Sequence, residues 1–581
     1  INCNDIIQLL IEEGLFYIEV YGEDLEEHVQ FSYERYHNIL TCRYLLDELK
    51  SREELLTSIE SGRLNNYLNS PYNGITEELF IMIPDKFDVE VLPLLDEKMV
   101  VRNLDNYINS LIWRNKDNIS IESVKKLINK YVVVRKYYHD SFINTLIILS
   151  PIEDHPLNIL FFQEYLKKLS IPIRDSLLAD ILYNGYSVNK TLDNLIGFCF
   201  SKSVDKFSKE CLKLIIYIVS WSLCSTNLQY RNSAIRALAA LFERNIDLAN
   251  DTIINFANID DPYIKEGIYC ALYGAVLRVD TFNNELEELV TEVYKDIFNS
   301  EEVYPNILVR DYARGIIEYG NIKGCKISFD IKDVRTPYNS CWYDSIPTQD
   351  EIDSFGYDYI DESIDRIMYS ANKIISSMAT NTGDKHMVYG DFGRYVFEGW
   401  VRPWRYHFLE QELSNIVVKE IFTKWGYNPE LHGEFDTSVK SYNRHRNDCE
   451  RIGKKYQRIA SYELIARLSD NFPAGDIEYI YSEEYSKKSQ KRLEKILASL
   501  GDEIFIDYNT KDNIEEETPR KILKEYAYKG PWQIGIRGID TSISSVNHNC
   551  MKKNHLKSVF KIPEISNEEW ASEGSTEPKI D

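Results

Sequence analysis

Apolar residues recur at helical spacing along most of this chain. In residues 156–323 one such segment follows another, separated by short breaks rich in Asp, Asn, Gly and Pro, such as those at 250–251 and 304–306. Apolar positions that return every three or four residues indicate amphipathic helices, and polar breaks of this kind are typical of helix ends. The pattern therefore predicts a mainly α-helical protein.

Three of these predicted helices share a small residue followed by an aliphatic one: Ala-Leu at 237–238, Ala-Leu at 271–272 and Gly-Ile at 315–316. The steps between them are 34 and 44 residues (271 − 237 and 315 − 271), which is in the range of repeats built from helical pairs. Small residues let neighbouring helices approach closely. We therefore expect an α-solenoid of TPR- or HEAT-like helical pairs, with an ordinary helical domain as the alternative.

The two ends of the chain follow other patterns. A short apolar helix pattern at 6–14 precedes two alternating segments, 16–21 and 28–33, which flank a turn-like Gly-Glu-Asp. A helix followed by a hairpin is the outline of a winged-helix module. Strand-like runs at 477–481 and 503–508 predict a small mixed α/β region near the other end.

These patterns divide the chain into four predicted parts. Residues 1–55 are the end of a winged-helix module, 56–325 a helical repeat region, 326–470 a second helical block and 471–581 a mixed α/β tail. Because the sequence begins at Ile1, already inside a helical pattern, we treat it as part of a longer protein.

Charge narrows the classes of partner. The 581 residues include 67 Lys and Arg against 92 Asp and Glu, a net charge of −25, which repels nucleic acid and anionic membranes at long range. The most apolar run, 214–223, is far shorter than the roughly 20 residues that cross a bilayer. We therefore expect no membrane contact and disfavour nucleic acid as a partner.

The cysteines and the short motifs suggest no chemistry. The ten cysteines form no CxxC pair and have no His at zinc-ligand spacing, so we expect reduced thiols in a cytoplasmic protein. The Gly-Lys-Lys at 453–455 lacks the other residues of a P-loop, and His-Gly-Glu at 432–434 lacks the cysteine pair of a zinc deaminase. We predict no catalytic, cofactor-binding or metal-binding residue in this chain, and no enzyme activity.

Two groups of residues have the composition of a protein-binding surface. A basic cluster runs through 440–458, and Trp lies beside Arg at 400–406 and again at 532–537. Trp and Arg are enriched at interface hot spots. Either group has a structural alternative, namely basic residues paired with the chain's own carboxylates, or Trp anchored in the core. The candidate partner-binding residues are Trp400, Arg402, Trp404, Arg444, Arg451, Lys455, Trp532 and Arg537.

Several short strings resemble one family. VQFSYERYHNIL at 29–40 and RYLL at 43–46 resemble the end of the winged-helix region that follows the nucleotide-binding core of STAND NTPases. YGDFGRY at 389–395, ERIGKKYQ at 450–457 and GPWQ at 530–533 resemble strings in the C-terminal region of bacterial antiviral STAND proteins, the Avs or AVAST group.

The resemblance implies the target-sensing region of an antiphage defence protein. Such proteins carry an N-terminal effector, commonly a nuclease, and a central NTPase that uses ATP and Mg, both upstream of the part represented here. The sensor binds a phage protein, the large terminase or the portal, and binding drives tetramerisation that activates the effector. Two alternatives stay open: a helical-repeat adaptor unrelated to defence, and a nucleic-acid-binding helical protein.

Overall fold

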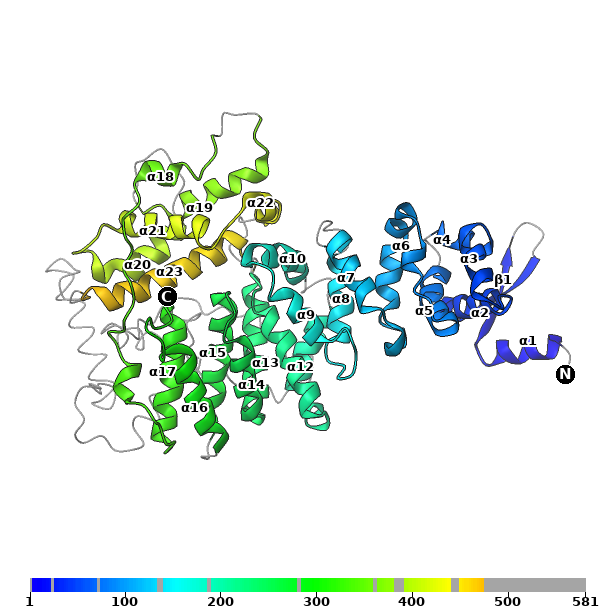
Figure 1. Cartoon of the computed structure of the whole chain (residues 1–581), viewed down its shortest axis with the longest axis horizontal. Helices are drawn as coiled ribbons and strands as arrows, with labels where there is room; N and C mark the ends of the chain where they lie inside the picture. The colour runs from blue at the N-terminus through cyan, green and yellow to red at the C-terminus, as the bar shows by residue number, and fades with distance from the viewer. Residues whose placement is uncertain are drawn as a thin grey trace. The chain divides into compact units, whose positions relative to one another are not determined.

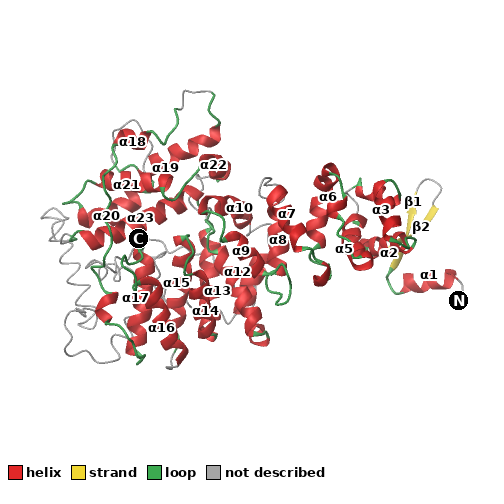
Figure 2. Ribbon diagram, viewed as in Figure 1, coloured by secondary structure: helices red, strands yellow, loops and turns green. Residues whose placement is uncertain are grey.

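The prediction of a mainly helical protein is confirmed in the computed structural model of the chain (Figures 1 and 2). Within the described residues, the only strands form one two-stranded sheet. These residues form two compact units, one up to Phe162 and one from Gln163 onwards. The structure describes residues 3–21, 26–70, 74–132, 139–184, 190–279, 284–358, 363–380, 391–439 and 449–474.

The first unit begins with a helix and an antiparallel hairpin. In the hairpin Phe16 pairs with Phe31 and Ile18 with Val29, so the predicted strands are present, the second beginning two residues early. Helix α2 packs against β2 and against α5. The elements are α1 (Cys3–Glu12), β1 (Phe16–Tyr21), β2 (Glu26–Phe31), α2 (Glu34–Asp47), α3 (Arg52–Glu60), α4 (Arg63–Leu68), α5 (Ile75–Phe87), η1 (Leu92–Leu94), α6 (Glu97–Ser110), η2 (Lys116–Asn118), α7 (Ile121–Leu127), η3 (Ile128–Val132) and α8 (His139–Leu149).

The core of this unit lies between α2, α5, α6 and α8, which pack on one another in that order. The rings of Phe80 and Tyr107 meet edge to face there, and both side chains are fully buried. The buried side chain of Asn103 donates a 2.7 Å hydrogen bond to the Leu68 carbonyl. Apolar packing, together with hydrogen bonds such as that of Asn103, therefore holds this unit together.

The second unit contains two rows of helices, α12–α14–α16 and α13–α15–α17, in which each helix packs on the next of its row (Figure 1). Three of the breaks are helix caps: Asn227, Asp261 and Asn306 each accept a hydrogen bond from a backbone amide of the following helix. The break predicted at 250–251 is wrong, because these two residues lie inside the helix Ile246–Phe256. After α9 (Ile159–Leu166), which spans the unit boundary, come α10 (Ile171–Asn184), α11 (Lys190–Phe200), η5 (Lys202–Lys206), α12 (Lys209–Ser222), α13 (Leu228–Arg244), α14 (Ile246–Phe256), α15 (Pro262–Val276), α16 (Asn284–Ile297) and α17 (Ile307–Ile322).

Helices α13, α15 and α17 carry the three small–aliphatic pairs, and they are consecutive neighbours. A Cβ atom at Gly315 would lie only 2.6 Å from the ring of Tyr273, so α15 and α17 approach closely at that point. The expectation that small residues permit close packing is therefore confirmed at Gly315.

A second group of helices follows, and its last helix joins it to the rows. Helix α23 packs on α15 and α17 on one side and on α19, α21 and α22 on the other (Figure 1). The elements are η6 (Ile331–Val334), α18 (Gln349–Asp353), η7 (Arg366–Tyr369), α19 (Ser370–Met378), η8 (Gly393–Phe397), α20 (Glu398–Val401), η9 (Arg402–Trp404), α21 (Glu410–Thr423), α22 (Pro429–Ser438) and α23 (Ile452–Asn471).

No helix within the described ranges is both long and apolar enough to cross a membrane. The predicted mixed α/β tail begins at residue 471, and from residue 475 onwards it lies outside the described residues.

Candidate protein-binding surface

Helix α23 is fixed in place by charged side chains inside the second unit. Lys455 is only 1% exposed, and its Nζ lies 2.7 Å from a carboxylate oxygen of Asp175 on α10 and 2.7 Å from one of Asp261 at the start of α15. Burial disfavours the charged lysine, but the two carboxylates outweigh it and raise the pKa of Lys455. These three residues, the Lys455 triad, tie α23 to two earlier helices.

The single positive charge of Lys455 can balance the negative charge of only one of the two carboxylates. Burial raises the pKa of Asp175 to about 6, although Lys455 opposes the shift. The pKa of Asp261 is lowered: burial would raise it, but Lys455 and Arg174 outweigh burial. The triad thus combines an ion pair between Lys455 and Asp261 with a second carboxyl that ionises only near pH 6.

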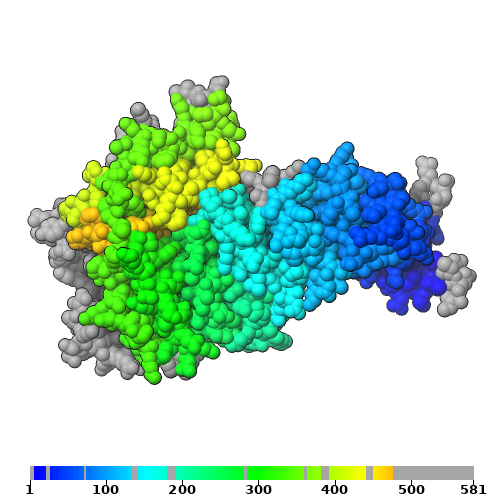
Figure 3. Space-filling view, in the orientation of Figure 1, coloured from blue at the N-terminus to red at the C-terminus, as the bar shows by residue number. Residues whose placement is uncertain are grey.

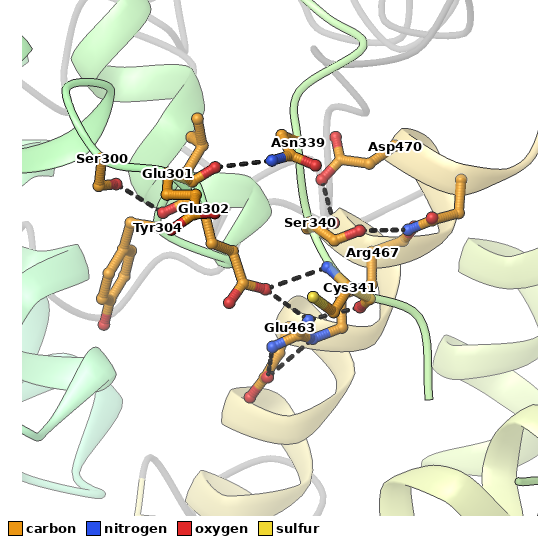
Figure 4. Close-up of polar contacts among 12 residues, drawn as sticks. Ser300, Glu301, Glu302, Tyr304, Asn339, Ser340, Cys341, Glu463, Arg467 and Asp470 are labelled. Carbon is orange, nitrogen blue, oxygen red and sulfur yellow. Dashed lines mark hydrogen bonds and ion pairs between the residues drawn. The ribbon is translucent and has the colours of Figure 1, made fainter. Parts of the chain in front are cut away.

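The far half of α23 holds two connecting segments by polar contacts (Figure 4). Arg467 lies 2.6 Å from a carboxylate oxygen of Glu302 and donates a 2.5 Å hydrogen bond to the Cys341 carbonyl. The Ser340 hydroxyl donates to Asp470, whose carboxylate also lies 2.9 Å from a guanidinium nitrogen of Arg310. The segment at 339–341 is therefore held against α23.

This contact places Trp342 in an aromatic cluster at the end of α23. The ring of Trp342 lies 5.1 Å from that of Phe408 and 4.7 Å from that of Phe472, between ring centroids. The indole Nε1 of the buried Trp404 donates a 3.0 Å hydrogen bond to the Phe472 carbonyl. The cluster gives the segment around residues 393–409 a rigid base.

That segment is an irregular helix, with a π-helical turn (η8), an α-helical turn (α20) and a 3₁₀ turn (η9) in succession. Its inner face buries Phe397, Val401 and Trp404. A Cβ atom at Gly393 would lie 2.4 Å from the Met378 carbonyl oxygen, so the turn starts in close contact with the end of α19. π-Helical turns are rare and are frequent at functional sites.

The outer face of the same segment exposes large side chains. Tyr395 is 71% exposed, and Tyr406 and Leu409 are exposed to a similar degree. The guanidinium of Arg405 lies 5.0 Å from the ring centroid of Tyr406 and donates a 3.0 Å hydrogen bond to its hydroxyl. Together with the exposed Arg402, Tyr395, Arg405, Tyr406 and Leu409 form what we call the aromatic–arginine surface.

Two of the predicted partner-binding residues belong to this region, and one does not reach its surface. Arg402 is exposed, and Trp400 is half-buried because its ring packs against Phe392 and Tyr462. Trp404 is 1% exposed and anchors the end of α23 instead. A buried side chain cannot contact a partner of the folded chain, so Trp404 leaves the candidate set.

Lys455 leaves the set for the same reason, because the triad encloses it. Its neighbours are paired as well. Lys454 lies 3.1 Å from a carboxylate oxygen of Asp391, and two guanidinium nitrogens of Arg458 donate hydrogen bonds to the Glu450 carboxylate. Of the basic cluster, Arg451 is partly exposed at the start of α23. Arg444, Trp532 and Arg537 lie outside the described residues, as do Lys440, His445 and Arg446.

The buried His432 has a structural role in this fold. Its Nε2 lies 2.9 Å from the Pro172 carbonyl oxygen, and its Nδ1 accepts a hydrogen bond from the Asn428 amide. Within the described ranges, no group of three or more His, Cys, Asp or Glu side chains is arranged to hold a metal ion.

Sequence reasoning missed Tyr395 and Leu409. A helix-spacing argument does not find them together, because the helical turns end at Trp404 and Leu409 has an extended backbone at the start of α21.

The chain matches no family model, no curated protein and no solved structure.

Proposed function

We propose that this chain is the target-sensing region of a modular antiviral STAND protein, and that it recognises a folded phage protein, the large terminase or the portal. The observation that carries the proposal is the aromatic–arginine surface, where Tyr395, Tyr406, Leu409 and Arg402 are exposed beside the partly exposed Arg405. Such residues supply most of the free energy at protein interfaces.

The packing of the second unit supports a sensor rather than a catalyst. In this proposal the helices that alternate between two rows belong to an α-solenoid of helical pairs, and the packing of each helix on the next of its row supports it. Such scaffolds commonly present extended surfaces to folded partners. In this proposal the N-terminal helix and hairpin are the remnant of a winged-helix module of the upstream NTPase.

Recognition must be coupled to the rest of the protein. A target shifts a conformational equilibrium only if it binds the active state more tightly than the resting one. In the proposed mechanism, target binding favours the state in which the upstream core, with ATP and Mg, assembles into a tetramer and activates its effector. The present chain contributes the binding step in the cytoplasm and needs no catalytic residue for it.

Binding of purified terminase and portal proteins to the chain, measured by biolayer interferometry, tests the proposal. We expect one of them to bind, and the double variant Tyr395→Ala/Tyr406→Ala to weaken that binding at least tenfold, about 1.4 kcal/mol. Phe207→Ala is the matched control, because Phe207 is an exposed aromatic residue outside the surface.

Each outcome separates one part of the proposal from another. Binding that the double variant leaves unchanged would dismiss the aromatic–arginine surface but not the target. Absence of binding to any terminase or portal tested, with the folded chain verified by circular dichroism, would dismiss phage-protein sensing and leave the adaptor alternative.

A further inference from the structure

The N-terminal helix and hairpin expose an unusual amount of apolar surface. Ile6 and Leu9 on α1, and Ile18, Val20 and Val29 on the hairpin, are between 45% and 58% exposed. We call Ile18, Val20 and Val29 the N-terminal apolar face.

The register of the hairpin places the three residues of this face beside one another. Ile18 pairs with Val29, and side chains two apart on a strand point to the same side, so Ile18, Val20 and Val29 share one side of the sheet. A two-stranded sheet is marginally stable in water unless its apolar side packs against another layer. In the described part of this unit, α1 contacts β1 and α2 contacts β2, yet these side chains remain exposed.

The N-terminal part of the sequence is acidic. Residues 1–34 contain nine acidic residues and neither Lys nor Arg. The first basic residue, Arg35, is turned to other contacts, with its guanidinium 3.1 Å from Glu78 and 4.0 Å from the ring centroid of Trp113. The nine are Asp5, Glu12, Glu13, Glu19, Glu23, Asp24, Glu26, Glu27 and Glu34.

This charge decides between the possible occupants. A second copy of the chain would bring another nine carboxylates to the same place, and nucleic acid or an anionic bilayer would be repelled as well. A partner that is apolar in the centre and basic at the rim gains from both the apolar contact and the charge.

We propose that the N-terminal apolar face binds a cationic amphipathic helix of a partner protein. Strands of six residues are about 20 Å long, which is the length of a helix of about 13 residues. Such a helix lays its apolar stripe on Ile18, Val20 and Val29, and its Lys or Arg residues reach carboxylates such as Glu27, which pairs with Val20 on the same side of the sheet. This inference concerns the hairpin of the first unit and does not depend on the aromatic–arginine surface of the second.

A designed peptide serves as the probe: a fluorescein-labelled 14-residue helix with leucines on one side and lysines on the other. Its binding to the whole chain is measured by fluorescence anisotropy. We expect Ile18→Ser/Val29→Ser to weaken binding at least tenfold, and Glu27→Gln, at the residue that pairs with Val20 on the same side of the sheet, to weaken it less and to reduce its salt dependence. Ile254→Ser is the matched control, because Ile254 is equally exposed on α14.

The design separates the proposed site from the general acidity of the chain. Equal binding by the parent and by Ile18→Ser/Val29→Ser would overturn the proposal, and so would equal binding of a peptide with glutamates in place of the lysines. Concentration-dependent dimerisation of the parent, abolished by Ile18→Ser/Val29→Ser in light scattering, would assign the face to a second copy instead. Circular dichroism of each variant verifies that it is folded.

Discussion

Helix α23 turns charged side chains to the inside of its unit, whereas the N-terminal hairpin exposes apolar side chains to solvent. Both regions depart from the usual distribution of side chains. On α23 a lysine and two arginines are turned to partners inside the second unit, where Lys455 meets two buried carboxylates. On the hairpin, Ile18, Val20 and Val29 are about half exposed. Buried charges cost free energy unless they are paired, and exposed apolar groups gain free energy when a partner covers them.

The comparison indicates that α23 contributes to folding and the hairpin to association. Paired charges accept few alternative positions, so α23 is fixed in register between the helical rows and the second group of helices. An exposed apolar face adds nothing to the stability of the isolated chain, and its contribution comes only on binding. We therefore expect substitutions on α23 to act on folding and substitutions on the hairpin to act on association.

The largest effect is expected from Lys455→Ala. It leaves Asp175 and Asp261 buried without their cation, and breaking a buried ion pair in this way costs about 3–5 kcal/mol. Urea unfolding of the variant and the parent measures the difference. Lys454→Ala is the control, because the Lys454–Asp391 pair is partly exposed, and we expect less than about 1 kcal/mol from it. A Lys455→Ala variant as stable as the Lys454→Ala control would contradict the role given to the triad.

A smaller loss is expected from Gly433→Ala on α22, which packs beside α23. The added Cβ would lie 2.3 Å from the Ile367 carbonyl oxygen, so backbone must move, at a cost of about 1–3 kcal/mol. Gly399→Ala is the same substitution with no atom within 4 Å of the added Cβ. Thermal unfolding should lower the Tm of Gly433→Ala alone, and equal Tm values for both would show that the contact is not tight.

Asp175→Asn should change the dependence of stability on pH. Because burial raises the pKa of Asp175 to about 6, the folded chain keeps a proton that the unfolded chain releases near pH 4. The free energy of unfolding of the parent therefore falls by the Asp175 contribution as pH rises from about 4 to 6, and that of the variant does not. We expect the stability of Asp175→Asn relative to the parent to rise by about 1–2 kcal/mol between pH 4 and pH 7. Parallel lines for the two proteins in denaturant unfolding at several pH values would refute this assignment.

The smallest effect on stability is expected at the hairpin. Ile18→Ser/Val29→Ser removes apolar groups that already contact water, so the free energy of unfolding should change by less than about 0.5 kcal/mol for each residue. Chemical unfolding followed by circular dichroism measures it. A loss above about 2 kcal/mol for the pair would mean that these side chains are covered in the folded chain, which would remove the contrast with α23.

The helical nature of the chain could be predicted because it depends on local spacing. Apolar positions every three or four residues, polar caps such as Asn227 and Asp261, and the alternation of 16–21 all act within a few residues. The close approach at Gly315 followed from the same reasoning, since a small residue within an apolar helix face permits it.

The roles of Lys455 and Trp404 could not be predicted, because their partners are distant in the sequence. Lys455 meets Asp175 and Asp261, which are 280 and 194 residues earlier. Trp404 donates to a carbonyl 68 residues later. Local composition cannot distinguish a lysine on a solvated surface from one that enters a triad.

The long sequence separation inside the triad has a consequence for how the protein is made. A ribosome adds about 5–20 residues per second, so Asp261 waits roughly 10–40 s, and Asp175 longer, for Lys455 to be synthesised. Throughout that time Asp175 on α10 and Asp261 at the start of α15 lack the lysine that lies 2.7 Å from each of them in the folded chain. We therefore expect the second unit to complete its packing late in translation, when α23 emerges.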